Sequence, residues 1–504
     1  MGEVRIYMMI IDTHILSLLI FSPLLGLLPL FLIPSSQEKI IKTLVFLFSL
    51  LPLFLGVILF SRFQGTGDFE FQEVTPWLTG FQVFYHLGVD GFSMPLVMLS
   101  TLLVPLVLLS SWNSVTKNLR GYLFFFLVLE SAMMGVFCAL DVFLFYVFWE
   151  AQLVPMYFLI GGWGGERRIY AAIKFVLYTM VGSLLMLAAI LYLYIGSGHS
   201  FSLGDLYHLH LPFLTQALLF GALTLAFVIK IPLFPFHTWL PDAHVEAPTG
   251  GSVILAGVLL KMGTYGLLRF SMPLFPLANF YFTPLLQVLS VIGIVYGSLV
   301  AMVQPDLKKL VAYTSVAHLG FVVLGLTSMN VQGVMGASLQ MINHGISTGA
   351  LFFLVGMIYE RRHTRQINDF GGLASVMPIF TVLFLIVTFS SIALPGTNGF
   401  VGEFLILLGS FKAAPILSSV AATGVIFGAV AMLWMVKRVF FGPVTHEENR
   451  RLLDLNSREV MVMLPLIVLI FAIGFAPGFL TKKMDKSVVR FVERVKGSNV
   501  IETK

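Results

Sequence analysis

Long apolar runs constrain this sequence more than any other feature. A helix that crosses a membrane needs about 20 mostly apolar residues, and the chain holds fourteen runs of this kind. They lie at 13–33, 40–60, 90–110, 121–139, 141–160, 171–195, 213–240, 249–271, 281–303, 307–327, 331–358, 375–415, 418–441 and 459–480. The runs are continuous, whereas strands of a transmembrane barrel alternate apolar and polar residues. The sequence therefore predicts an all-α, multi-pass membrane protein.

The composition excludes several classes of protein. Charged residues make up only 11% of the 504 residues, against about 25% in a soluble domain. So few charges cannot cover a water-facing surface, which excludes soluble enzymes and nucleic-acid binders. The single cysteine, Cys138, leaves no ligand set for a disulfide framework, a thiolate zinc site or an iron–sulfur cluster. The sequence also lacks a dinucleotide fingerprint and a Walker loop, so we expect no cofactor in this chain.

The basic residues between the predicted spans predict the orientation. Loops after odd-numbered spans hold seventeen Lys and Arg; the other side holds four, with seven more in the C-terminal tail. The positive-inside rule places the side with seventeen in the cytoplasm. Both termini are then expected on the outer, periplasmic side of a bacterial cytoplasmic membrane. The basic tail, from Lys482 to Lys504, contradicts the rule locally.

Seven ionisable side chains fall deep inside predicted spans. They are Glu130, Glu150, Lys230, Lys261, His318, His344 and Glu403. Each charge at a helix centre costs about 2.5–3.5 kcal/mol on insertion scales, so these groups must be paired, hydrated or neutral. Structural ion pairs between helices are one interpretation, but small residues serve packing at lower cost. A row of Glu, Lys and His instead indicates a proton path, and the two lysines disfavour a metal-ion site.

Two of the long runs are interrupted beside buried charges. Pro232 and Pro235 follow Lys230 in the seventh run, and Pro395–Gly396 precedes Glu403 in the twelfth. Proline breaks the helical ladder, and irregular backbone at this depth is tolerated only inside protein or beside a water cavity. The breaks are five helices apart, which predicts inverted repeats of helices 4–8 and 9–13, as found in transporters.

This pattern predicts four regions. They are an N-terminal three-helix region (1–120), a first five-helix repeat (121–271), a second (281–441), and a C-terminal helix and tail (442–504). Asp141 is expected to cap a helix start, where a carboxylate suits the helix dipole. His237 and a loop at 239–249 are expected to have a structural role at the break.

Three segments carry a resemblance to a known family. They read KIPLFPFHTWLPDAHVEAPTGGSVILAGVLLKMGTYGLLRF (230–270), LPGTNGFVGEFLILLGSF (394–411) and DVFLFYVFWEAQLVPMYFLIGGWG (141–164). They resemble the antiporter-like M subunits of proton-pumping NADH:quinone oxidoreductase, respiratory complex I, which are the bacterial counterparts of mitochondrial subunit 4. The resemblance covers nearly the whole chain, and is weakest in the first 80 and the last 25 residues.

The resemblance implies a role for each buried ionisable group. Glu150 and Lys230 would be the charge pair on the input side, and Lys261 the central carrier. His318 and His344 would continue a hydrated axis, and Glu403 would be the terminal carrier that leads outward. Siblings of this subunit tend to have Lys at the last position, so Glu fits the M type. A direct role for Glu130 is left open.

The resemblance also implies partners. Other subunits of the complex I membrane arm, with sibling antiporter-like subunits on either side, would surround the chain within the bilayer. FMN, iron–sulfur clusters and quinone would be held by partner subunits, so this chain would move protons and carry no redox centre. The alternatives are an Mrp-type sodium/proton antiporter subunit, a membrane-bound hydrogenase subunit, or a passive scaffold.

Overall fold

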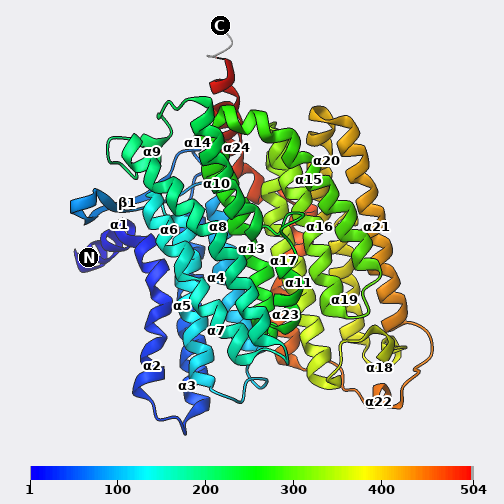
Figure 1. Ribbon diagram of the computed structural model, residues 1–504. Helices are drawn as coiled ribbons and strands as arrows, with labels where there is room; N and C mark the ends of the chain where they lie inside the picture. Colours follow the sequence, from blue (N-terminus) through cyan, green and yellow to red (C-terminus); the bar gives the residue numbers. More distant parts are fainter. Residues whose placement is uncertain (1, 501–504) are drawn as a thin grey trace.

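The chain folds into a bundle of long helices that run roughly parallel to one axis (Figure 1). A computed structural model describes residues 2–500, and side chains over 13–496. Within that part, thirteen helices are long and apolar enough to cross a membrane. The fourteenth predicted span, 375–415, is two shorter helices, α19 (Pro378–Ser391) and α20 (Asn398–Ala413). The prediction of an all-α membrane protein with about fourteen spans is confirmed.

Most spans are single helices, and five consist of shorter segments. The single helices are α3 (Glu38–Arg62), α4 (Ser93–Ser110), α5 (Leu119–Cys138), α8 (Arg168–Gly196), α15 (Pro276–Met302), α16 (Leu307–Thr327), α17 (Val331–Arg362), α21 (Pro415–Phe440) and α23 (Ser457–Phe475). The segmented spans are α1 (Gly2–Leu25) with α2 (Leu27–Leu32), α6 (Val142–Ala151) with α7 (Leu153–Trp163), α10 (Phe213–Lys230) with α11 (Trp239–Glu246), α19 with α20, and helix eight, described below. Short helices α9 (Leu203–Leu206), α18 (Leu373–Val376), η4 (Ile367–Asp369) and α22 (Glu447–Arg450) lie in the connections.

Both predicted breaks are present. The seventh span stops at Lys230, and helix resumes only at Trp239. The twelfth stops at Ser391 and resumes at Asn398, across Gly396 with a φ of +92°, a left-handed conformation that favours glycine. The predicted loop at 239–249 is wrong in part, because residues 239–246 form α11. Its Pro241 lies in the first turn, where a missing N–H breaks no helical bond.

The eighth span is more irregular than its sequence indicates. It consists of α12 (Thr249–Ile254), a π-helical segment η2 (Leu255–Leu259), α13 (Leu260–Gly266), a second π-helical segment η3 (Leu267–Ser271) and α14 (Met272–Leu274). Lys261 therefore lies in a short α-helical stretch between two wider turns. Such π-helical turns occur often at functional sites.

Two elements were not predicted, and both lie toward the end of the bundle opposite α18 and α22. Strands β1 (Glu70–Leu78) and β2 (Val83–Val89) form an antiparallel hairpin with the turn η1 (Thr79–Phe81). The predicted tail is a helix, α24 (Gly478–Val500), which lies at this end of the bundle (Figure 1). Gly91 lets it approach closely, because a Cβ there would lie 2.8 Å from the carbonyl oxygen of Lys483. The hairpin is too short, and α24 too polar, to resemble a span.

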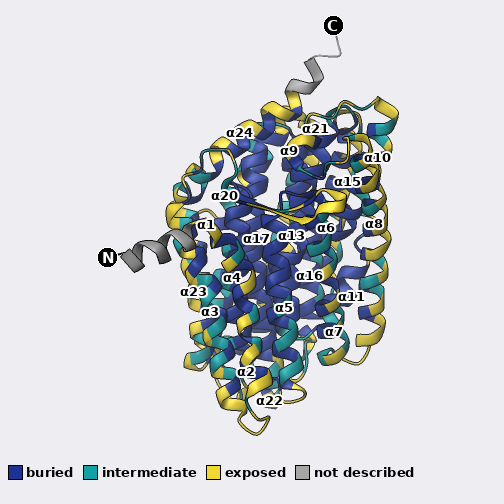
Figure 2. Ribbon diagram, turned by 90° about the vertical axis from the view of Figure 1, so that its left-hand side faces the viewer, coloured by how far each residue is buried: buried dark blue, intermediate teal, exposed yellow. Residues whose placement is uncertain are grey.

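Burial divides the bundle into interior and outer helices. The apolar windows of helix eight and α17 are entirely buried, whereas those of α3 and α21 are only 28% buried. Figure 2 shows buried residues concentrated around α5, α16 and α17, with exposed residues along the outer helices. The outer apolar faces suit lipid, and the interior helices carry the ionisable groups. The boundaries between the four predicted regions stay a prediction.

Candidate proton-relay site

Lys261 and His344 lie in direct contact at the centre of the bundle. The Nζ of Lys261 is 2.7 Å from Nδ1 of His344, and it also donates to the carbonyl oxygen of Ala256. Both side chains are buried. They meet because helix eight and α17 approach closely at two glycines: a Cβ on Gly345 would lie 2.8 Å from the carbonyl oxygen of Gly257. A lysine amine and an imidazole at this distance can exchange a proton.

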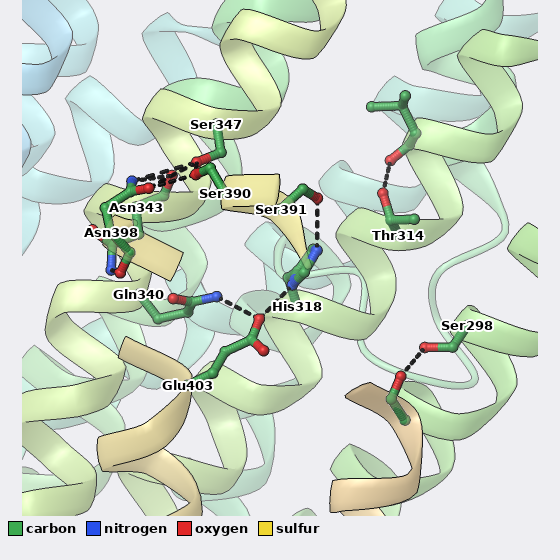
Figure 3. Close-up of polar contacts among 12 residues, drawn as sticks. Ser298, Thr314, His318, Gln340, Asn343, Ser347, Ser390, Ser391, Asn398 and Glu403 are labelled. Atoms are coloured by element: carbon green, nitrogen blue, oxygen red, sulfur yellow. Dashed lines mark hydrogen bonds and ion pairs between the residues drawn. The ribbon is translucent and has the colours of Figure 1, made fainter. Parts of the chain in front are cut away.

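His318 and Glu403 form a second contact beside the first. Nδ1 of His318 is 2.9 Å from Oε1 of Glu403, and the same oxygen accepts a hydrogen bond from Nε2 of Gln340 at 3.0 Å (Figure 3). The imidazole rings of His318 and His344 are 5.7 Å apart between centroids. Helix eight, α17, α16 and α20 thus place Lys261, His344, His318 and Glu403 in one continuous row.

A polar cluster at the break of the twelfth span was missed by the sequence reasoning. Ser347 and Ser390 lie 2.6 Å apart between hydroxyl oxygens, and Ser390 donates to Oδ1 of Asn398 at 2.5 Å. Asn343 donates from Nδ2 to the carbonyl oxygen of Asn398 at 2.7 Å (Figure 3). The cluster joins α17 to both halves of the broken helix. Its signal in the sequence is the spacing of Asn343 and Ser347, which lie one helical turn apart among the polar residues of α17.

The expected ion pair between Glu150 and Lys230 is not formed. No salt bridge within 4.0 Å joins them, and the buried Nζ of Lys230 and Oε1 of Glu150 make no hydrogen bond. The ammonium lies instead 5.4 Å from the ring centre of Trp149 and 5.3 Å from that of Phe175. Aromatic faces attract a cation, so they provide an alternative environment for Lys230.

Glu130 stands apart from the row. It is fully buried in α5, and neither carboxylate oxygen has a hydrogen-bond partner. Desolvating a carboxylate without a partner is costly. A structural role through hydrogen bonding to protein is therefore not apparent, and a direct role in proton transfer stays a prediction.

His244 is a further buried histidine that the sequence reasoning passed over. Its ring stacks on Phe352 at 4.5 Å, and both ring nitrogens lack a hydrogen-bond partner. Asp141 has the predicted role, because its carboxylate accepts from the backbone N–H groups of Phe143 and Leu144 at 2.9 and 3.0 Å.

No metal site accompanies these residues. Across the described chain, from residue 13 to residue 496 for side chains, no group of three or more His, Cys, Asp or Glu could hold a metal ion. The row itself consists of groups that bind and release protons.

The fold and the buried row define an antiporter-like membrane protein. Over residues 139–428 the chain matches the family described as NADH:quinone oxidoreductase/Mrp antiporter, TM, and over 17–138 that of the NADH-ubiquinone oxidoreductase chain 4 amino terminus. It is 47% identical over 436 residues to NADH-quinone oxidoreductase subunit M of Rhodobacter capsulatus, covering 84% of this chain and 85% of that protein. The chain therefore belongs to the family of subunit M and chain 4 of NADH:quinone oxidoreductase.

Solved structures confirm the fold. A chain of respiratory complex I from Thermus thermophilus is 34% identical with a TM-score of 0.88, covering 96% of this chain and 100% of that one. A chain of the Mrp complex from Dietzia sp. DQ12-45-1b has a TM-score of 0.84 at 19% identity, covering 95% of this chain and 99% of that one. At that identity the Mrp likeness shows the fold alone.

Proposed function

We propose that this chain is the M-type subunit in the membrane arm of a proton-pumping NADH:quinone oxidoreductase, and that it moves protons through its buried row. The observation that carries the proposal is the contact chain from Lys261 through His344 and His318 to Glu403. Such groups are expensive inside a membrane and mark proton relays. Membership of the M and chain 4 family supports the assignment to complex I.

The separation of Glu150 and Lys230 suggests how the row is driven. A nearby carboxylate stabilises a protonated lysine, and its removal favours release of the proton. A conformational or electrostatic change elsewhere in the complex would alter this pairing and push a proton toward Lys261. The position of Lys230 near two aromatic rings, without a hydrogen bond to Glu150, supports a pairing that can change.

The charge distribution supports a defined orientation in a bacterial cytoplasmic membrane. The turn at 33–37, α18 and α22 lie at one end of the bundle, which we call the basic end (Figure 1). By the positive-inside rule this end faces the cytoplasm, and both termini lie on the periplasmic side. The basic tail stays an exception to the rule, because the seventeen basic residues of the other side outweigh it; in α24, Lys483 donates to the carbonyl oxygen of Phe63, and Arg490 pairs with Asp68.

The rest of the enzyme would lie in other subunits. FMN, iron–sulfur clusters and quinone would be held there, and neighbouring membrane-arm subunits would flank this chain. Purifying the complex through a tag on this chain tests the assembly. Subunits that bind NADH and flavin support the proposal, whereas a nickel hydrogenase or an isolated sodium/proton antiporter would overturn it.

Proton transfer itself is tested by Lys261→Met in the assembled complex. We expect proton pumping coupled to NADH oxidation to fall by about tenfold or more, the scale on which a lost acid–base group acts. NADH oxidation with an artificial electron acceptor should be retained. Lys412→Met, which changes an exposed lysine at the end of α20, is the matched control. Normal pumping by Lys261→Met would refute the relay.

A further inference from the structure

A small cavity lies beside His318, and His344 is not among the residues that line it. Its volume is about 20 Å³, and a buried water needs roughly 10–15 Å³ by the same kind of measure. It lies between α15, α16 and α21 and reaches the end of α19. The lining includes Ser298, Thr314, His318, Ser391, Glu403 and Gly428.

The space exists because of two glycines in α21. A Cβ on Gly424 would lie 2.3 Å from Cγ2 of Ile294, so Gly424 lets α21 pack closely against α15. One turn later, a Cβ on Gly428 would meet only Oγ of Ser298, at 3.9 Å. Gly428 therefore leaves room that an ordinary side chain would fill.

Polar groups with unused hydrogen-bonding capacity line this cavity. Oε1 of Glu403 is occupied by His318 and Gln340, whereas Oε2 makes no hydrogen bond among the described residues. Nε2 of His318 has only the hydroxyl of Ser391, at a long 3.4 Å. Oγ of Ser298 donates to the carbonyl oxygen of Gly424 at 3.3 Å and can still accept. A buried water typically needs two to four such partners, and the cavity supplies them.

The cavity extends from His318 toward the basic end. Thr314 precedes His318 by one helical turn in α16, which starts at the turn 303–306. That turn is tied to the loop before α18 by an ion pair between Asp306 and Arg365 at 3.3 Å. Ser298 lies at the level of Thr314, because a Cβ on its neighbour Gly297 would meet the carbonyl oxygen of Tyr313 at 3.1 Å.

We propose that this cavity holds water through which His318 receives protons from the basic end, as a second inlet that joins the row at His318 and that pumping needs in addition to Lys261. The proposal rests on the relay function above. A relaying imidazole takes a proton at one nitrogen and releases it from the other. Nδ1 of His318 contacts Glu403, so the receiving nitrogen is Nε2, which lies beside the cavity residue Ser391. A hydronium O–H bond breaks as Nε2–H forms, and Nδ1–H breaks as a proton joins Oε1 of Glu403.

The test fills the cavity with side chains of equal size and different polarity. Gly428→Val adds two methyl groups to the site, and Gly428→Thr replaces one of them with a hydroxyl that can stand in for water. In the assembled complex we expect Val to lower proton pumping per NADH by about tenfold and Thr to restore about half of the parent rate. Gly221→Val is the matched control, since a Cβ on this exposed glycine of α10 has no atom within 4 Å.

Assembly is measured by NADH oxidation with an artificial acceptor. If Val and Thr prevent assembly, Gly428→Ala and Gly428→Ser compare an apolar and a hydroxyl side chain of smaller size, with one and two heavy atoms. Equal pumping by the apolar and hydroxyl variants, whether high or low, would overturn the inlet. Lys261→Met is assayed in parallel. If Lys261→Met pumps normally, the relay itself is refuted. If Lys261→Met loses pumping but Gly428→Val and Gly428→Thr pump equally, only the inlet is refuted.

Discussion

The Nζ of Lys261 lies 2.7 Å from Nδ1 of His344, and no carboxylate takes part in this contact. A lysine buried in a membrane would ordinarily be paired with an acid. Here its partners are an imidazole and a backbone carbonyl, neither of which carries a negative charge. The pair can share one proton between two basic groups, which suits a carrier that must pass its proton on.

Gly345 sets the distance of that contact. We expect Gly345→Ala to separate α17 from helix eight, since the new Cβ would lie 2.8 Å from the carbonyl oxygen of Gly257 and 2.4 Å from Leu99 Cδ2. Overpacking of this kind costs about 1–3 kcal/mol, and pumping should fall while some complex still assembles. Gly349→Ala is the control one turn away, where the nearest atom is 3.7 Å from the Cβ. Similar pumping by both variants would show that the approach is not needed.

Glu150→Gln and Lys230→Ala should each abolish most proton-coupled quinone reduction. No hydrogen bond joins the two side chains, so neither substitution breaks a direct contact between them. NADH:quinone activity in native membranes is compared with NADH oxidation by an artificial acceptor. A parallel fall of both activities, with loss of the complex, would mean that the two residues are structural.

Glu403 is expected to be the exit group. Glu403→Gln keeps a hydrogen-bonding side chain beside His318 and Gln340 but cannot release a proton, whereas Glu403→Asp retains the acid. We expect Gln to lower pumping by about tenfold or more and Asp to retain part of it. Proton release by membrane vesicles after an NADH pulse measures both. Full pumping by the Gln variant would place the outward path elsewhere.

Asp141 links the start of α6 to the hairpin. Its carboxylate caps α6 and accepts from the backbone N–H of Phe84 at 3.1 Å. Burial raises the pKa of this carboxyl, against the effect of these backbone hydrogen bonds. Because Asp141→Ala removes the cap hydrogen bonds, it should cost roughly 0.5–2 kcal/mol, the range for a lost cap, and Asp141→Asn much less. Thermal inactivation of the purified complex compares the two, and equal losses would argue against the capping role.

Local features of the sequence determined the spans, the two breaks and the seven buried ionisable residues. Apolar length, proline position and the cap at Asp141 act over a few residues, so they can be recognised without knowledge of the fold. The polar side chains of α17 at 343 and 347 were visible too, but nothing local indicated that they meet Asn398 and Ser390. The hairpin and α24 were missed because neither has the length and hydropathy of a span.

Only the tertiary structure decided which buried groups meet. Lys261 lies against His344, and His318 against Glu403, because glycines let helices distant in the sequence approach. Glu150 and Lys230, by contrast, are joined by no hydrogen bond, and the lysine lies near the rings of Trp149 and Phe175 instead. The sequence determined that charges must be buried, because a helix long enough to span a membrane carries its ionisable residues with it. Their pairing depends on the spacing and rotation of packed helices, which no single helix contains.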